Sequence, residues 1–281
     1  MIKNLNLLIK KLGNFFKKKL PHKASNFNNK KLNSSPNKDE SQNASGFFKT
    51  LILAIFLAGI IRSFLFEPFH IPSGSMKPTL LIGEYVFVKK YAYGYSHFSF
   101  PFSINFFSGR IFAKTPKRGD IAVFRYPLDP KINYIKRIIG LPDDKIQMRN
   151  GTLYINDQIV KKEVVGEFKD VINSQIITTE LYLETFPDGK KIHTLDLQFS
   201  AQDNTGIYYV PQGHYFVMGD NRDNSQDSRF LDQLGFVPDE NLIGQASLIF
   251  FSISEPFWKF WLWPNSIRFQ RIFTNISDEK I

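Results

Sequence analysis

The segment FFKTLILAIFLAGIIRSFLF, residues 47–66, separates two parts of the chain that differ in composition. Its only charges are Lys49 near one end and Arg62 near the other, where long side chains can reach a polar interface. A helix of this length spans roughly the 30 Å thickness of a hydrocarbon core. The segment therefore predicts a transmembrane helix. The uninterrupted apolar run from Thr50 to Ile61 is shorter, so a buried helix of a soluble protein is the competing interpretation.

The net charge of +10 is concentrated before this segment. Residues 1–50 hold 11 lysines against Asp39 and Glu40, whereas the rest of the 281 residues hold 25 basic and 24 acidic side chains. A basic tail beside an apolar run is typical of the cytoplasmic side of a membrane, and a nearly neutral folded part argues against a nucleic-acid partner. We expect residues 1–46 to be a basic cytoplasmic tail and linker. For residues 5–20, both a helix lying on the inner leaflet and a disordered tail stay open.

The residue types exclude several kinds of site. The chain has no cysteine, which excludes thiol catalysis, disulfides and thiolate metal sites. Its five histidines show no paired ligand spacing, so we expect no metal and no cofactor. The composition is 43% apolar and 15% aromatic, which is enough for the core of one domain with a subdomain.

Beyond residue 67 the pattern changes to short apolar runs broken by turns, which predicts a mainly β domain over residues 67–281. Residues 152–212 are more polar and turn-rich, and we interpret them as a possible β-ribbon-like subdomain. Strands are predicted at residues 85–88, 120–124, 134–139, 153–155, 207–210, 215–218 and 246–251.

The loop IPSGSMKPTL, residues 71–80, follows the apolar segment closely and carries a candidate nucleophile, Ser75. Pro72 and Pro78 restrict its backbone, while Gly74 lets another chain approach. An ordinary turn-rich loop has the same composition. A serine hydroxyl becomes an effective nucleophile only when a nearby base takes its proton. The loop therefore needs a partner elsewhere in the chain.

Lysine and histidine are the candidate bases. A Ser75, His214 and Asp220 triad is formally possible, although His214 follows a glycine in an expected turn. Strand alternation places Lys136 and Arg137 on opposite faces of a sheet. Burial can lower the pKa of a lysine, whereas arginine keeps its proton, so Lys136 is the more useful residue to bury. In the alternative, both are solvated charges on an edge strand.

The segment GDNRDNSQDSR, residues 219–229, is dense in charge. A calcium loop starting at Asp223 would need glycine at its sixth position and glutamate at its twelfth, where the chain has Ser228 and Leu234. Alternating acids and arginines instead predict an ion-pair network that stiffens a loop and can hold Ser225 against a neutral lysine.

Four segments in this order resemble the conserved boxes of the bacterial type I signal peptidase, or leader peptidase, family. They are SGSMKPTL at residues 73–80, KRGDIAVF at residues 117–124, YIKRIIGLP at residues 134–142 and GDNRDNSQDSR at residues 219–229. The resemblance extends from about residue 47 to about residue 254. One departure is Asp143, where the family usually has glycine.

The resemblance implies a Ser/Lys dyad with Ser75 as nucleophile and Lys136 as general base. It implies that the Ser75 amide and the Ser73 hydroxyl stabilise the oxyanion, that Ser225 orients the lysine, and that four charged residues support their loop: Asp220, Arg222, Asp227 and Arg229. It further implies shallow pockets for small residues one and three positions before the scissile bond, lined by Phe69, Ile71, Met76, Val123, Tyr134 and Ile135.

The expected protein is a serine endopeptidase of the cell inner membrane, with a single span, a cytoplasmic N-terminus and an extracytoplasmic catalytic domain. Its expected partners are the signal peptides of secretory preproteins and membrane lipids, and we expect a monomer. The aromatic segment 257–263 favours either the membrane interface or a core. Two alternatives are another membrane-tethered Ser/Lys protease, close to the organellar inner-membrane peptidases, and a non-enzymatic anchored β-domain that binds envelope partners.

Overall fold

The computed structural model describes residues 38–100, 107–172, 175–197, 200–256 and 258–276. The segment predicted to lie on the inner leaflet, residues 5–20, is outside the described residues. Helix α2 spans Lys38–Phe64. It begins before the predicted apolar segment, and residues 38–46 contain no proline that would interrupt a helix. It ends before Phe66, because Pro68 restricts the preceding residue to an extended backbone.

Residues Gly46–Phe64 of α2 form a 19-residue stretch with a mean hydropathy of 1.9, long and apolar enough to cross a membrane. The large apolar side chains along it are exposed; Ile52 and Phe56, for example, are 66% and 64% exposed. A core helix of a soluble protein would bury such a face, so the competing interpretation of a buried helix is wrong.

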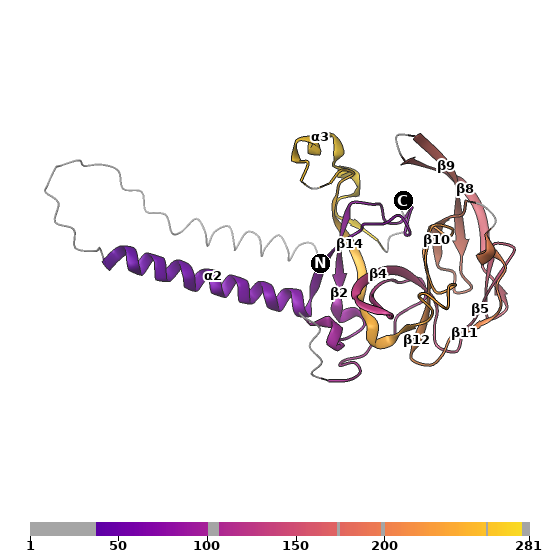
Figure 1. The fold of residues 1–281 in the computed structure, drawn as a ribbon, viewed down its shortest axis with the longest axis horizontal. Coiled ribbons are helices and arrows are strands. Elements are labelled where there is room, and N and C mark those ends of the chain that lie inside the picture. Colours follow the sequence, from indigo (N-terminus) through magenta and orange to yellow (C-terminus); the bar gives the residue numbers. More distant parts are fainter. Residues whose placement is uncertain (1–37, 101–106, 173–174, 198–199, 257, 277–281) are drawn as a thin grey trace. The chain divides into compact units, whose positions relative to one another are not determined.

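An antiparallel sheet of eight strands forms the largest part of the structure (Figure 1). The order is β1-β2-β14-β3-β4-β12-β13, with β15 paired to β14. The bounds are β1 Phe66–His70, β2 Glu84–Lys89, β3 Ile121–Tyr126, β4 Asp129–Gly140, β12 His214–Met218, β13 Val237–Pro238, β14 Leu242–Ser252 and β15 Thr274–Asn275.

Two smaller sheets, with strand orders β10-β9-β8 and β11-β5-β6-β7, lie between β4 and β12 in sequence. Figure 1 shows β8 and β9 as a long hairpin, which gives this region its ribbon character. The bounds are β5 Lys145–Arg149, β6 Thr152–Ile155, β7 Gln158–Ile159, β8 Lys161–Ile172, β9 Gln175–Thr185, β10 Lys191–Leu195 and β11 Tyr208–Tyr209.

The remaining helices in the described part of the chain are short. They are the 3₁₀ turns η1 Lys90–Ala92, η2 His97–Ser99, η4 Ala201–Asp203, η5 Asp239–Asn241, η6 Phe260–Leu262 and η7 Phe269–Arg271, and the single-turn α3 Trp263–Ser266. The mainly β prediction is confirmed, and each predicted strand overlaps an observed one. Strands β1, β5, β7, β8, β9, β10, β13 and β15 were not predicted.

Strand β4 lies inside the large sheet, between β3 and β12. Lys136 pairs with Ala122 of β3, and Arg137 lies between Ile121 of β3 and Met218 of β12. Because both neighbours are present there, Lys136 and Arg137 are both buried, at 5% and 6% exposure. The alternative of two solvated edge charges is wrong, and Arg137 also needs a partner inside the protein.

Candidate active site

The side chains of Ser75 and Lys136 are in contact, although 61 residues separate them in sequence. Lys136 extends from β4, and Ser75 lies in the turn that follows β1. The Nζ atom of Lys136 is 2.7 Å from the Oγ atom of Ser75, and 3.1 Å from the carbonyl oxygen of Ile135. Both residues are buried, so bulk water has little access to the contact.

Burial lowers the pKa of Lys136 from 10.5 to about 8. Desolvation disfavours the ammonium, while the negative charges of Asp227 and Asp220 favour it and limit the shift. Near pH 8 a large fraction of the molecules therefore carries a neutral amine beside Ser75. Such an amine can accept the hydroxyl proton.

The loop that carries Ser75 is fixed by the start of segment 219–229. The backbone amide of Asn221 donates to the Ser75 carbonyl at 3.1 Å, and its Nδ2 atom donates to the Gly74 carbonyl at 3.0 Å. A Cβ atom on Gly219 would lie 2.5 Å from the Ser75 carbonyl oxygen and 2.3 Å from the Ser225 Oγ atom. Glycine at 219 therefore allows the two loops to approach this closely.

Asp220 joins the nucleophile loop to β4. It accepts hydrogen bonds from Arg137 Nε at 2.7 Å and Arg137 Nη2 at 2.6 Å, and from the Thr79 hydroxyl at 2.6 Å. The two bonds from one guanidinium fix its plane as well as its position. Arg137, which follows Lys136 in sequence, thus neutralises the carboxylate of Asp220 in segment 219–229.

Two further buried ion pairs hold the rest of segment 219–229. Asp227 accepts from Arg229 Nε at 2.8 Å and from the Gly219 amide at 3.0 Å. Arg222 donates to both oxygens of Glu184 on β9, at 2.5 and 2.6 Å. Sequence reasoning missed Glu184, because a lone glutamate in a polar strand carries no local sign of a partner 38 residues away.

A fourth ion pair, between Arg271 and Glu84, reaches the nucleophile loop from the C-terminal side. Arg271 donates to the Thr79 carbonyl at 2.8 Å and to the carboxylate of Glu84 at 2.8 and 3.0 Å. Glu84 is fully buried. Residues from β2, β4, η7 and segment 219–229 together hold the short loop around Ser75.

Residues 44–251 of the chain match the family described as signal peptidase, peptidase S26. The chain belongs to this family. It is therefore a serine peptidase that cleaves signal peptides.

The curated relatives extend over nearly the whole chain. Signal peptidase I of Rickettsia typhi is 42% identical over 264 residues, which cover 87% of this chain and 97% of the relative. Signal peptidase I of Rickettsia prowazekii is 42% identical over 249 residues, 82% of this chain and 92% of the relative. A solved signal peptidase I structure from Enterococcus faecalis aligns with 29% identity and a TM-score of 0.29, covering 47% of this chain and 97% of that one.

The other serines expected at a signal peptidase site lie close by. The Oγ atom of Ser73 is 3.5 Å from that of Ser75. Ser225 is buried against Gly219, and its hydroxyl has no hydrogen-bond partner among the described residues. Among the described residues there is therefore no hydrogen bond from Ser225 that would orient Lys136 as the resemblance implies.

Five of the six residues expected to line the substrate pockets belong to one apolar cluster. Ile71, Met76 and Val123 are buried in it, while Phe69 and Ile135 are partly exposed at its border. Tyr134 belongs to the neighbouring cluster and stacks on Tyr126, with ring centroids 4.8 Å apart. Phe69, Tyr134 and Ile135 are thus partly exposed at the border of these clusters, whereas Ile71, Met76 and Val123 are buried within one of them.

Two other sequence features can now be placed. His214 is partly exposed at the start of β12, and its Nδ1 atom lies 2.9 Å from the Gln212 carbonyl oxygen. Asp220 is hydrogen-bonded to Arg137. The triad of Ser75, His214 and Asp220 is therefore not formed.

Asp143 has a φ of 70°, the left-handed conformation that glycine usually occupies and aspartate tolerates. The family departure at 143 therefore keeps a glycine-like backbone.

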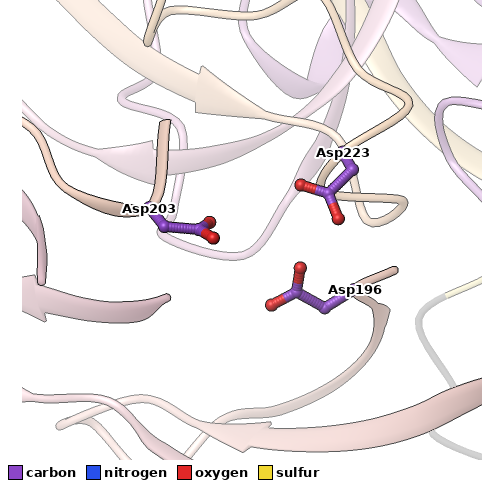
Figure 2. A group of neighbouring side chains, drawn as sticks. All are labelled: Asp196, Asp203 and Asp223. Atoms are coloured by element: carbon purple, nitrogen blue, oxygen red, sulfur yellow. The ribbon is translucent and has the colours of Figure 1, made fainter. Parts of the chain in front are cut away.

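One carboxylate oxygen each from Asp196, Asp203 and Asp223 lies within 4.8 Å of the others (Figure 2). Protein groups contact each of them. Lys162 forms an ion pair with Asp196, the Ser200 amide donates to Asp203 at 2.8 Å, and the Leu197 amide donates to Asp223 at 2.7 Å. Burial raises the pKa of Asp196. We assign no metal to this cluster.

Proposed function

We propose that this signal peptidase cleaves its substrates with a dyad in which Ser75 is the nucleophile and Lys136 the general base. The contact of 2.7 Å between two buried side chains, one of them a lysine with a lowered pKa, carries this assignment. Neutral Lys136 takes the Ser75 proton as Oγ attacks the carbonyl carbon of the scissile bond. The protonated lysine then gives that proton to the leaving amine.

The acyl-enzyme is hydrolysed by the same groups. Neutral Lys136 takes a proton from water, the hydroxide attacks the ester carbonyl, and the proton returns to Ser75 Oγ as the ester bond breaks. In both steps the oxyanion is stabilised by the Ser75 amide and the Ser73 hydroxyl, and the position of Ser73 beside Ser75 supports this role. Each such donor contributes roughly 3 kcal/mol to the transition state.

The remaining site residues act on geometry and on substrate choice. Asp220, Arg222, Asp227 and Arg229 hold the loop that fixes the Ser75 backbone, and Ser225 provides a buried hydroxyl beside it. Small substrate side chains are selected where Phe69, Tyr134 and Ile135 border the apolar floor of Ile71, Met76 and Val123.

The enzyme is anchored by α2 as a single-pass, monomeric protein of the inner membrane, with its N-terminus in the cytoplasm. The exposed apolar stretch Gly46–Phe64 and the lysines before it support this topology. Trp258, Phe260 and Trp261 are 72%, 68% and 63% exposed, which supports contact between the folded domain and lipid. The catalytic domain then lies outside, where signal peptides emerge.

Cleavage of a preprotein by the full chain in liposomes tests the dyad. We expect Ser75→Ala and Lys136→Ala to lower kcat by roughly a thousandfold or more, because each removes a group that the reaction requires. Lys145→Ala is the matched control, since Lys145 forms an exposed ion pair with Asp157 in a smaller sheet. Retained processing by either active-site variant would refute the dyad.

A further inference from the structure

The C-terminal end of α2 is bonded to the folded domain through its backbone. Carbonyl groups in the last turn of a helix have no partner within the helix. Here Lys90 Nζ donates to the Arg62 carbonyl at 3.3 Å and the Tyr95 hydroxyl donates to the Phe64 carbonyl at 2.7 Å. The Lys90 amide donates to the Leu65 carbonyl at 3.1 Å. We call this set of contacts the anchor junction.

Lys90 is buried in the anchor junction, unlike an ordinary surface lysine. Its ammonium lies 2.7 Å from a carboxylate oxygen of Glu67, and the negative end of the α2 dipole also favours a positive charge here. Burial lowers the pKa of Lys90, and the ion pair with Glu67 opposes this. A buried, paired ammonium is costly to separate from its partners, so the contact resists opening.

Aromatic rings surround the same point. Phe64 packs edge-to-face against Tyr95 and Phe100, with centroid distances of 5.8 and 5.6 Å. Phe66 packs in the same way against Phe87 and Tyr91, at 6.2 and 5.8 Å. These contacts lie on both sides of Leu65, where the helix changes to strand, and they restrict bending there.

The path from the anchor junction to Ser75 is held at each stage. All five residues of β1 pair with β2, and the next amide, that of Ile71, donates to the Glu84 carbonyl at 2.8 Å. The Ser75 carbonyl then accepts from Asn221. A strand of five residues is about 17 Å long. The end of α2 and the nucleophile are thus joined by a paired strand rather than by a flexible tether.

We propose that the anchor junction sets the distance between the end of the membrane helix and Ser75, and so selects which peptide bond of a membrane-inserted signal peptide is cleaved. This proposal rests on the proposed function. A signal peptide held in the bilayer presents its bonds at fixed distances from its apolar segment, and only a bond at the matching distance reaches Ser75. Lys90 and Tyr95 are positioning residues in this scheme.

Two substrates separate this role from general stability. One is a short soluble peptide with a single cleavage site; the other is a preprotein inserted in liposomes, with two acceptable sites several residues apart. For the full chain with Tyr95→Phe, Lys90→Met or both, we expect peptide kcat/KM within about twofold of wild type. Preprotein processing should fall by about tenfold in the double variant, the effect of one or two hydrogen bonds, with more cleavage at the second site.

Tyr182→Phe and Lys145→Met are the matched controls, because each removes the same group from an exposed pair in a smaller sheet. Two glycines inserted between Leu65 and Phe66 should change site choice most. Equal losses on both substrates would show a merely structural role, and unchanged site choice in the insertion variant would also overturn the proposal. Loss of peptide hydrolysis in Ser75→Ala tests the dyad separately.

Discussion

At the scale of single residues, the proposed dyad depends on a lysine that loses its proton more readily than an ordinary lysine. The pKa of Lys136 falls to about 8 through burial, and Asp227 and Asp220 prevent a larger fall. The hydroxyl of Ser75 is 2.7 Å away, so the neutral amine has its proton donor in place. A fully solvated lysine would stay protonated at neutral pH and could not act as a base.

We expect kcat/KM for a peptide substrate to rise with pH and to level off above about 8, because only the neutral form of Lys136 accepts the serine proton. A pH series at low substrate concentration measures this limb. A rate that is constant from pH 6 to pH 10 would contradict a lysine base, with stability at each pH as the control.

The same pKa predicts how stability depends on pH. The folded pKa of Lys136, about 8, is below its ordinary 10.5, so between these values the unfolded chain binds more protons and stability rises with pH. At pH 7 the buried charge costs the folded state about 3 kcal/mol. Lys136→Met should therefore raise the free energy of unfolding at pH 7 and flatten its rise above pH 8, as measured by denaturant titration. The same pH dependence in variant and wild type would contradict this.

The site also depends on the absence of a side chain at Gly219. In Gly219→Ala the new methyl group would meet the Ser75 carbonyl oxygen at 2.5 Å, so the nucleophile loop must shift. A displacement of about 1 Å lowers the rate by roughly a hundredfold. The measurement is the acylation rate with a peptide substrate. Gly206→Ala is the control, since nothing lies within 4 Å of its Cβ position; equal rates in the two variants would argue against this contact.

At the scale of elements, β4 matters because it has neighbours on both sides. The pattern of residues 134–139 predicted a strand. That this strand is buried could be seen only from the structure, where β3 and β12 lie on either side of it. Local alternation therefore predicted Lys136 as a buried base, but it could not predict that Arg137 would be buried as well. The order of strands in a sheet depends on contacts between distant parts of the chain. The alternation of residues along one strand therefore does not predict which strands lie next to it.

The strands that sequence reasoning missed share a physical cause. In β8 and β9 most of the described side chains are exposed or partly exposed, so no apolar face alternates with a polar one. In β1, Pro68 and the neighbouring apolar segment obscured the strand. Residues of three sequence boxes lie together in the structure, since Lys136 and Asn221 both contact Ser75, whereas Glu184 lay outside all four boxes.

The ion pair between Arg222 and Glu184 joins β9 to segment 219–229. Glu184→Gln would leave a buried guanidinium without its counter-charge, so we expect a loss of about 3 kcal/mol in the free energy of unfolding, together with lower activity. Denaturant unfolding of the full chain measures the first effect. Glu163→Gln, an exposed change on β8, is the control; similar stabilities for both variants would refute the assignment.

At the scale of the whole molecule, the asymmetric charge of the chain sets its expected orientation. Eleven lysines precede or enter the apolar segment, and the remainder is nearly neutral. In sealed spheroplasts, an added protease should therefore digest the β-rich domain and leave the N-terminal tail, detected through a tag, intact. A cytoplasmic marker protein controls for leakage. Digestion of the tag in sealed cells would reverse the proposed topology.

The contacts of Arg271 carry a consequence for the synthesis of the enzyme. This guanidinium, near the end of the described chain, bonds to Thr79 and Glu84, which leave the ribosome some 190 residues earlier. Until the last turns emerge, the loop around Ser75 lacks one of its fixed partners and Glu84 lacks its counter-charge. We therefore expect a nascent chain that has not yet reached residue 271 to hold Ser75 in an incompletely fixed loop.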